Sequence, residues 1–214
     1  MKQFEHIELR EKVLKRIRNA LINQTDINAE QLNIEINAFK KLEDPLAFEF
    51  AKNFTSNGGF FYYADNKEEL KMAINSLLQE KDFMSVYCGN EIISDLINTR
   101  IITVLNDIND ISFSNTVITE CDFLCARSGS ILLSSFLSSG RRGIATNNAL
   151  IVVAEINQIV SDVQEALQAE LDKYSAEFPS LISFVSGPSC TTDIEQEKIV
   201  GALGSKEIYL FLHE

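Results

Sequence analysis

The stretch SGPSCTTDIE, at residues 186–195, is the most informative part of the sequence for the fold of this chain. It follows the apolar run Leu181–Val185, so a strand is expected to lead into a polar turn here. Thr192 and Glu195 have the three-residue spacing of a capping box, in which each side chain satisfies a backbone N–H of the first helical turn. We therefore expect a strand, a loop and a helix that begins near Asp193.

The same loop has the residue types of a small-anion site. Gly187 permits backbone conformations that other residues resist, and hydroxyl groups at Ser189, Thr191 and Thr192 would lie beside the positive end of the expected helix. The alternative is a purely structural corner, because strand–glycine–helix turns with capping boxes reverse the chain in most α/β domains. Local chemistry leaves both interpretations open.

Apolar runs alternate with segments of helical periodicity along the chain before this loop. The apolar runs lie at Phe60–Ala64, Phe83–Cys88, Ile101–Leu105, Val117–Thr119 and Ala149–Ala154, and a last strand is expected at Ile208–Leu212. Helices are expected between Pro45 and Gly58, over Leu70–Leu78, over Asn90–Ile97 and over Ile156–Leu171. This alternation predicts an α/β fold with an open, mainly parallel sheet and flanking helices.

Two segments do not fit the alternation. Residues 121–139 mix apolar side chains with many serines, and we expect a helical piece, a turn at Ser128–Ser130 and then a strand. Glycines and asparagines at residues 140–148 predict a loop.

The chain divides at about residue 43. Residues 1–43 are expected to form an N-terminal helical arm, because Val13, Leu14 and Ile17 recur at helical spacing within residues 8–23. Its apolar stripe needs a partner surface, either on the same chain or on a second subunit. The α/β domain is expected over residues 44–214, since the alternation of strands and helices lies there.

Net charge and hydropathy limit the partners. With 31 acidic and 19 basic residues the formal net charge is -12, which repels nucleic acid and anionic membrane surfaces. No stretch approaches the roughly 20 apolar residues of a membrane-spanning helix, and residues 1–6 lack an apolar signal-peptide core. We expect a cytoplasmic protein without membrane insertion or nucleic-acid binding, and the sequence leaves its oligomeric state open.

The cysteines give no sign of a metal centre. Cys88, Cys121, Cys125 and Cys190 include no CxxC pair, and without nearby histidines they fit reduced, buried thiols better than metal ligands. The sequence also lacks a nucleotide-binding glycine fingerprint, an iron–sulfur cysteine set and a flavin motif. We therefore expect no metal and no resident cofactor.

Four sequence blocks, in order, carry a family resemblance. They are Thr119–Asp122, Ala126–Ile131, Gly140-Arg141, and Gly187–Glu195 followed by Gly201–Ser205. Together they resemble the lactate-utilization (LUD) domain, in the branch called lactate utilization protein C. The similarity is clear from about Thr116 to Leu212 and fades towards the N-terminus. It implies an open α/β fold of the sugar-isomerase and CoA-transferase type.

The resemblance also implies a function. It points to an accessory component of bacterial L-lactate utilization, in which lactate is oxidised to pyruvate together with iron–sulfur partner proteins. It supplies no mechanism, so catalytic residues and enzymatic activity stay open. The alternative is a small-molecule enzyme or binding protein that takes a phosphorylated or carboxylated metabolite at the Gly187–Thr192 loop.

This chain departs from the family at positions that matter for a site. Cys190 stands where relatives typically carry arginine, and Leu203-Gly204-Ser205 stands where they typically carry His-Gly-Pro. A histidine expected near residues 147–149 is also missing. The two histidines of the chain, His6 and His213, lie near its ends, so they are poorly placed for histidine acid–base catalysis.

The candidate site combines the loops Ser128–Ser130, Gly140–Asn148 and Gly187–Thr192, each beside an expected strand. Open α/β sheets bind ligands at the carboxyl ends of their strands, and only the last loop has this polarity, so convergence of all three on one cleft stays open. A small carboxylate or phosphate would be bound there by Ser128, Ser130, Arg141, Gly187, Ser189, Thr191, Thr192, Asp193 and Glu195. Asp193 and Glu195 could act as acid and base, or could only stabilise a helix N-terminus.

Overall fold

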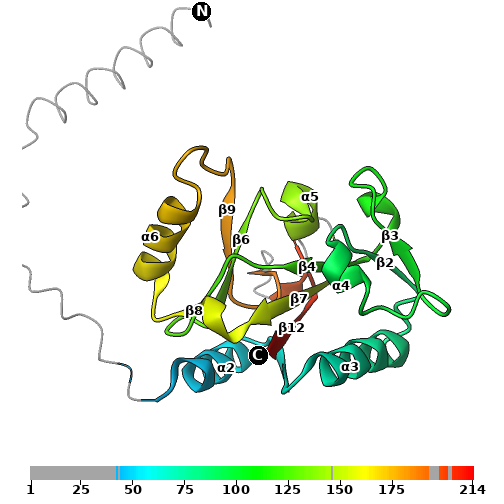
Figure 1. Ribbon diagram of the computed structural model, residues 1–214, viewed down its shortest axis with the longest axis horizontal. Coiled ribbons are helices and arrows are strands. Elements are labelled where there is room, and N and C mark those ends of the chain that lie inside the picture. Colours follow the sequence, from blue (N-terminus) through cyan, green and yellow to red (C-terminus); the bar gives the residue numbers. More distant parts are fainter. Residues whose placement is uncertain (1–41, 43, 146, 193–197, 202–203) are drawn as a thin grey trace, which may run out of the picture. The chain divides into compact units, whose positions relative to one another are not determined.

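The computed structural model describes residues 42, 44–145, 147–192, 198–201 and 204–214, which form one compact unit beginning at Leu42. Its centre is a sheet of six strands, all parallel, in the order β1-β12-β7-β4-β2-β3 (Figure 1). The strands are β1 (Phe60–Ala64), β2 (Ser85–Tyr87), β3 (Thr103–Leu105), β4 (Thr116–Glu120), β7 (Ala149–Glu155) and β12 (Glu207–His213). The prediction of an open, mainly parallel sheet is confirmed.

Apolar side chains cover both faces of this sheet, as expected for parallel strands. One face packs against α3 (Lys67–Glu80) and α4 (Glu91–Ser94) through residues such as Ile118, Ile151 and Phe211. The other face packs against α2 (Leu46–Ser56), α5 (Gly140–Ala145) and a second, smaller sheet. Its core contains Val117, Leu150, Val152, Leu210 and Leu212, the alternate residues of the same strands.

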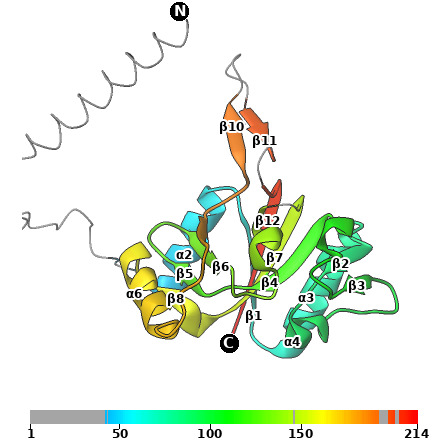
Figure 2. The same cartoon turned by 90° about the horizontal axis from the view of Figure 1, so that it is seen from above.

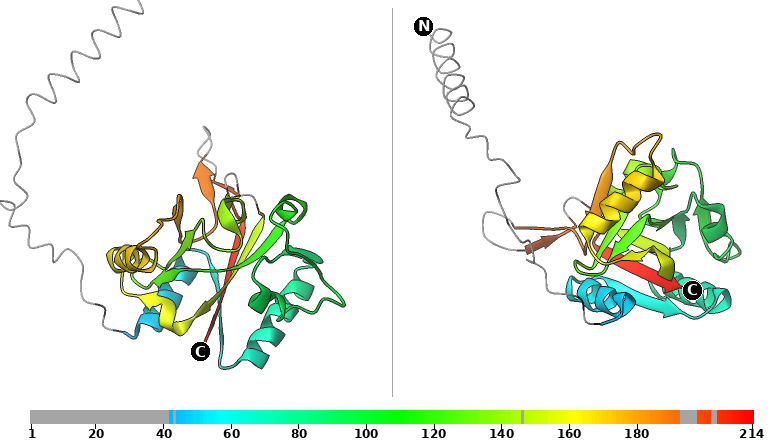
Figure 3. Two further views of the ribbon diagram at one scale, coloured as in Figure 1. Left: turned by 45° about the horizontal axis from the view of Figure 1, so that its top comes forward. Right: turned by 60° about the vertical axis from the view of Figure 1, so that its left-hand side comes forward.

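The smaller sheet has the strand order β8-β5-β6-β9. Its strands are β8 (Ile159–Val160), β5 (Phe123–Cys125), β6 (Ser130–Ser134) and β9 (Ile182–Val185). The helix α6 (Val163–Lys173) packs against β5 and β8, and two short 3-10 helices, η2 (Ile111–Phe113) and η3 (Ile156–Gln158), lie in connections. Figure 3 shows α6 and β9 on the opposite side of the main sheet from α3.

The helix expected to start near Asp193 falls on residues 193–197, which lie outside the described residues, and a strand lies on each side of them. Cys190–Thr192 is instead strand β10, which pairs antiparallel with β11 (Lys198–Val200) in a hairpin that projects from the domain (Figure 2). The β-branched residues Thr191 and Ile199 face each other in this ladder, and they favour strand over helix. Asp193 and Glu195, which belonged to the expected helix start, lie outside the described residues.

Three further segments differ from the prediction. Residues 121–125 are not helical, because β5 and β6 form an antiparallel hairpin around the turn at residues 126–129. Part of the expected loop at residues 140–148 is the helix α5. The long helix expected from Ile156 begins at Val163, where the Asp162 side chain accepts hydrogen bonds from two backbone N–H groups of the first turn.

The arm predicted over residues 1–43 lies outside the described residues except for Leu42. The boundary near residue 43 therefore stays a prediction. Among the described residues no helix combines the length and the apolar character that crossing a membrane requires.

Candidate functional site

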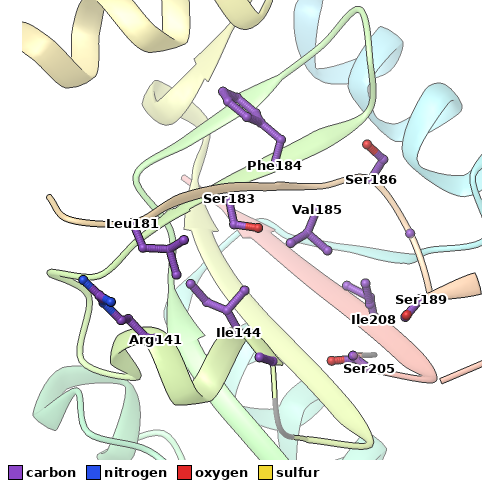
Figure 4. A pocket seen from close by; sticks show the side chains of 13 residues that line it. Arg141, Ile144, Leu181, Ser183, Phe184, Val185, Ser186, Ser189, Ser205 and Ile208 are labelled. Carbon is purple, nitrogen blue, oxygen red and sulfur yellow. The ribbon is translucent and has the colours of Figure 1, made fainter. Parts of the chain in front are cut away.

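A pocket of about 390 Å³ lies between α5, β9 and the start of β12, and we call it the Arg141 pocket (Figure 4). Apolar side chains form its middle, among them Ile144 of α5, Val185 of β9 and Ile208 of β12. Arg141 lies at one end, and Ser189 and Ser205 lie at the other (Figure 4). The pocket therefore combines one cationic end, an apolar middle and one hydroxyl-bearing end.

The antiparallel register of β9 explains which side chains face the pocket. Ser183 pairs with Leu133 of β6 and Phe184 with Leu132, so successive side chains point to opposite faces. Leu181, Ser183 and Val185 point into the pocket, whereas Phe184 points away (Figure 4) and packs beneath α6 with the small core around Cys125. Two apolar groups and one hydroxyl are thus presented along the pocket wall.

The backbone of Ser189 is held at the base of the β10–β11 hairpin. Its N–H donates to the Ser205 carbonyl at 2.9 Å, and its carbonyl accepts from the Gly201 N–H at 2.7 Å. The hydroxyl groups of Ser183 and Ser189 form no hydrogen bond within the described part of the chain. Both hydroxyls are therefore available to a ligand.

Arg141 supplies the charge of this pocket. It lies on the exposed side of α5, and its guanidinium donates a hydrogen bond to the Ser180 hydroxyl. Among the described lining residues, no other side chain is charged. A guanidinium next to an apolar wall is an arrangement that suits a carboxylate with a short apolar substituent.

The structure brings together only part of the predicted site. Arg141, Gly187 and Ser189 line the pocket, but Thr191 lies out on the exposed strand β10, in which Thr192 also lies. The predicted residues Asp193 and Glu195 lie outside the described residues. Gly187 is required by packing, because a Cβ atom there would lie 2.2 Å from the Asn57 carbonyl oxygen.

Ser128 and Ser130 do not reach this pocket. They flank Gly129 in the turn between β5 and β6, and their hydroxyl groups form a hydrogen bond with each other. The turn packs on the C-terminal end of α2, where the Asn57 amide donates to the Ser128 carbonyl at 2.9 Å. These two serines therefore belong to a structural turn rather than to the candidate site.

The pocket also lies at the opposite edge of the sheet from the one expected. Ile208 is the second residue of β12, and Ala145 precedes the start of β7, so the lining gathers near the amino ends of these strands. The hairpin of β10 and β11 comes between β9 and β12, and its base lies against the segment before β12, where the Ser189 N–H donates to the Ser205 carbonyl.

Comparisons with known proteins agree with this fold. Residues 107–212 match the family model described as the LUD domain. This part of the chain is a LUD domain. The family is associated with lactate utilization. The crystal structure of a DUF162 family protein from Deinococcus radiodurans superposes with a TM-score of 0.60 at 17% identity, covering 79% of this chain and 96% of that chain. None of the curated proteins compared with the chain matches it.

The first LUD block, Thr119–Asp122, holds the smaller sheet to α6. The buried Asp122 carboxylate accepts hydrogen bonds from the Lys173 ammonium at 2.5 Å, the Tyr174 hydroxyl at 2.9 Å and the Ser134 N–H at 3.1 Å. Three donors satisfy the buried Asp122 carboxylate, so the role of this residue is structural.

Glu170 lies beside this ion pair and is fully buried, at 0% exposure. Neither of its carboxylate oxygens has a hydrogen-bond partner within the described structure. Burial, reinforced by the neighbouring Asp122 charge and opposed by Lys173, raises the pKa of Glu170 to about 7. The helical pattern of the sequence placed Val163, Leu167 and Leu171 on the buried face of this helix, but these side chains are exposed, and the buried residues of α6 are Ala166 and Glu170.

The last LUD block closes against the segment before β7. The Ser205 hydroxyl donates a hydrogen bond to the side-chain oxygen of Asn147, whose amide in turn donates to the Gly143 carbonyl. Both Asn147 and Ser205 are buried. The polar side chains of Ser205 and Asn147 are therefore satisfied by each other and by the Gly143 carbonyl.

Proposed function

We propose that this LUD-domain protein is an accessory component of bacterial L-lactate utilization, in which lactate is oxidised to pyruvate with iron–sulfur partner proteins. We propose further that the Arg141 pocket binds a small carboxylate of this pathway. Family membership supports the pathway, and the chemistry of the pocket supports the ligand class.

The observation that carries the ligand proposal is the combination of groups that line the pocket, which are one guanidinium, apolar side chains and two hydroxyl groups without a hydrogen bond in the described part of the chain. A carboxylate would pair with the Arg141 guanidinium, in a charge-assisted hydrogen bond that is stronger than a neutral one. A methyl group would contact Ile144 or Leu181 beside it. A hydroxyl or keto oxygen would meet the hydroxyl of Ser183 or Ser189. L-Lactate and pyruvate carry these groups on three adjacent carbons.

The pocket favours a carboxylate over a phosphorylated metabolite. Doubly charged phosphate groups are usually bound by several cations or by the N–H groups of a helix N-terminus. The described lining offers Arg141 as its one charged side chain, and Ser189 leads into strand β10.

The same lining supports binding rather than catalysis. No carboxylate, imidazole or thiol lies among the described residues of the pocket, so no general base is positioned there to activate its serine hydroxyls. Cys190 lies outside the lining, exposed in β10, with its thiol 3.4 Å from the Pro188 carbonyl oxygen. The redox step is accordingly assigned to the iron–sulfur partners.

Thermal unfolding of the full chain tests the ligand proposal. L-Lactate, pyruvate and inorganic phosphate are compared at constant ionic strength, and a ligand at a hundred times its Kd contributes about 2.7 kcal/mol. For a chain of this length we expect the two carboxylates to raise Tm by about 5–10 °C, and phosphate to have little effect. Arg141→Ala should abolish the rise, and the adjacent Arg142→Ala, outside the lining, is the matched control.

An equal rise in the Arg141→Ala and Arg142→Ala variants would exclude the pocket as the binding site. The pathway is tested separately, by lactate-dependent electron transfer through the iron–sulfur partners with and without this chain. An unchanged rate when the chain is omitted would refute the accessory role.

A further inference from the structure

The helix α6 carries its apolar side chains on a side that the described part of the domain leaves exposed. Val163, Leu167 and Leu171 follow one another at intervals of four residues and are 37%, 37% and 50% exposed. The side chains of α6 that face the domain are Ala166 and Glu170. Residues four apart form one row along a helix, so the three exposed side chains make a continuous ridge. α6 lies at the periphery of the domain (Figure 1), where a second molecule can reach this ridge.

Contacts at both ends of α6 fix this orientation. At its start, the Asp162 side chain accepts hydrogen bonds from two backbone N–H groups. At its end, Lys173 Nζ lies 2.5 Å from an Asp122 carboxylate oxygen, and the Tyr174 hydroxyl donates to the same carboxylate at 2.9 Å. Turning the helix to bury its leucines would break the contacts with Asp122. The exposed ridge is therefore a property of the folded domain.

Two aromatic rings continue the ridge at the end of α6. Tyr174 follows Leu171 by three residues, which places it on the same side of the helix. Its ring centroid lies 5.1 Å from that of Phe136, in an edge-to-face contact, and Phe136 is 45% exposed. Contiguous exposed apolar side chains of this kind mark interaction surfaces, whereas scattered ones do not. We call this surface the α6 face, and its residues are Val163, Leu167, Leu171, Tyr174 and Phe136.

The distribution of charge indicates what the α6 face can bind. Two copies of a chain with a net charge of -12 repel each other unless acidic side chains are absent from their contact. The exposed side chains that follow the ridge around the helix are the neutral Gln164 and Gln168. Glu165 and Asp172 lie about 140–160° around the helix from Leu167, on the other flank. A neutral surface on an acidic protein suits a second copy of the chain better than a basic partner.

The ridge is also complementary to itself. It is symmetric about Leu167, so a two-fold axis at this residue would place Val163 of one copy opposite Leu171 of the other. Rows of residues four apart interdigitate in the commonest class of helix packing, at a crossing angle of about −50°. The axis makes the two helices roughly antiparallel, which brings the positive N-terminal end of each towards the negative C-terminal end of the other.

We propose that the α6 face is the interface of a homodimer, in which the α6 helices of two copies pack against each other about a two-fold axis at Leu167. The contact is one helix of 11 residues long, and we expect it to bury less than the roughly 800 Å² per partner of a standard interface. The dimer should therefore form reversibly as the protein concentration rises. Arg141 does not belong to the α6 face, so this proposal is independent of the ligand proposed for the Arg141 pocket.

Sedimentation velocity of the full chain tests the interface, at concentrations of about 1–500 µM that span weak dimerisation. We expect the species to change from monomer to dimer across this range. Leu167→Glu should raise the Kd of the dimer at least about tenfold, because two carboxylates would meet at the axis. Ile92→Glu is the matched control, since Ile92 is a 73% exposed apolar residue on α4, and it should leave the Kd unchanged.

Charge reversal at the axis distinguishes this interface from any other. Leu167→Lys should also weaken the dimer, whereas an equimolar mixture of Leu167→Glu and Leu167→Lys should dimerise again, because opposite charges then meet. A wild type that stays monomeric throughout would overturn the proposal and leave the α6 face to a different molecule. A dimer that is equally stable in Leu167→Glu and Ile92→Glu would overturn it too, and a mixture that stays monomeric would refute the two-fold contact at Leu167.

Discussion

Replacing Glu170 by glutamine should change how the stability of the domain depends on pH. The folded state holds this carboxyl in full burial with a pKa of about 7, whereas its ordinary value is 4.5. Between these values the folded protein keeps a proton that the unfolded chain has released. Stability therefore falls as the pH rises across this window, and it stays low above it.

The size of the effect follows from the displacement of the pKa. One pKa unit corresponds to about 1.36 kcal/mol, so a rise from 4.5 to about 7 costs up to about 3 kcal/mol once the carboxyl is ionised. Glutamine has nearly the same shape and no charge. Glu170→Gln should therefore be more stable than the wild type by as much as about 3 kcal/mol at about pH 8, and nearly equal to it at about pH 4.

Urea unfolding followed by circular dichroism across this pH range measures the difference. The matched control is Asp172→Asn, an exposed carboxylate of the same helix that accepts a hydrogen bond from Gln168. It should shift stability by no more than about 0.5 kcal/mol at any pH. If the wild type and Glu170→Gln lose stability in parallel between about pH 5 and 8, Glu170 is ionised in the folded protein and the reasoning from its burial is refuted.

Three further predictions concern the framework. Gly129→Ala should cost about 2–4 kcal/mol of unfolding free energy, because its Cβ atom would lie 2.3 Å from the backbone nitrogen of Phe54. Gly140→Ala has a similar positive φ, but its Cβ atom would lie at an ordinary contact distance of 3.8 Å from Ile108 Cδ1, so thermal unfolding should show a loss of only about 1 kcal/mol. Equal losses in the two variants would contradict the packing argument. Asp122→Asn should lower the free energy of unfolding by about 1–3 kcal/mol, because Lys173 and Tyr174 lose a charged hydrogen-bond acceptor. It should also speed hydrogen exchange of the α6 amides, and unchanged exchange would show that the ion pair does not hold this helix. Deletion of residues 1–43 should leave a cooperative thermal transition, and an insoluble product would place the arm in the core.

The main sheet was predictable because its strands are strongly patterned. Runs such as Ala149–Ala154 and Ile208–Leu212 are apolar on both faces, which is typical of central parallel strands. Asn66 and Asp162 cap α3 and α6 by local hydrogen bonds. Helix starts of this kind are set by neighbouring residues, but the apolar pattern led us to expect the helix from Ile156, seven residues before α6 begins at Val163.

The errors occur where long-range pairing outweighs a local signal. Thr192 and Glu195 satisfy the spacing of a capping box, yet Thr192 pairs with Lys198 in a hairpin. Phe123–Cys125 forms a strand because β6 and β8 flank it; the strand after the turn was predicted, but its pairing with residues 123–125 and the parallel neighbour β8 were not.

The candidate site was predicted only in part, for the same reason. Arg141, Gly187 and Ser189 could be named from their blocks, but Leu181 and Ser183 enter the Arg141 pocket through the register of β9 against β6. Ser128 and Ser130 have the right chemistry, and the fold places them against α2 instead.

The order of strands also bears on how the protein is made. β1, near residue 60, has β12 as its neighbour in the sheet, and β12 is formed by residues 207–213. During synthesis β1 has no partner strand until β12 leaves the ribosome and inserts between β1 and β7. Until then Phe60 and Tyr62 of β1 lack the aromatic rings of β12 on which they stack in the folded domain. Chains stopped before β12 would expose this edge, and they are the species on which we expect chaperones to act.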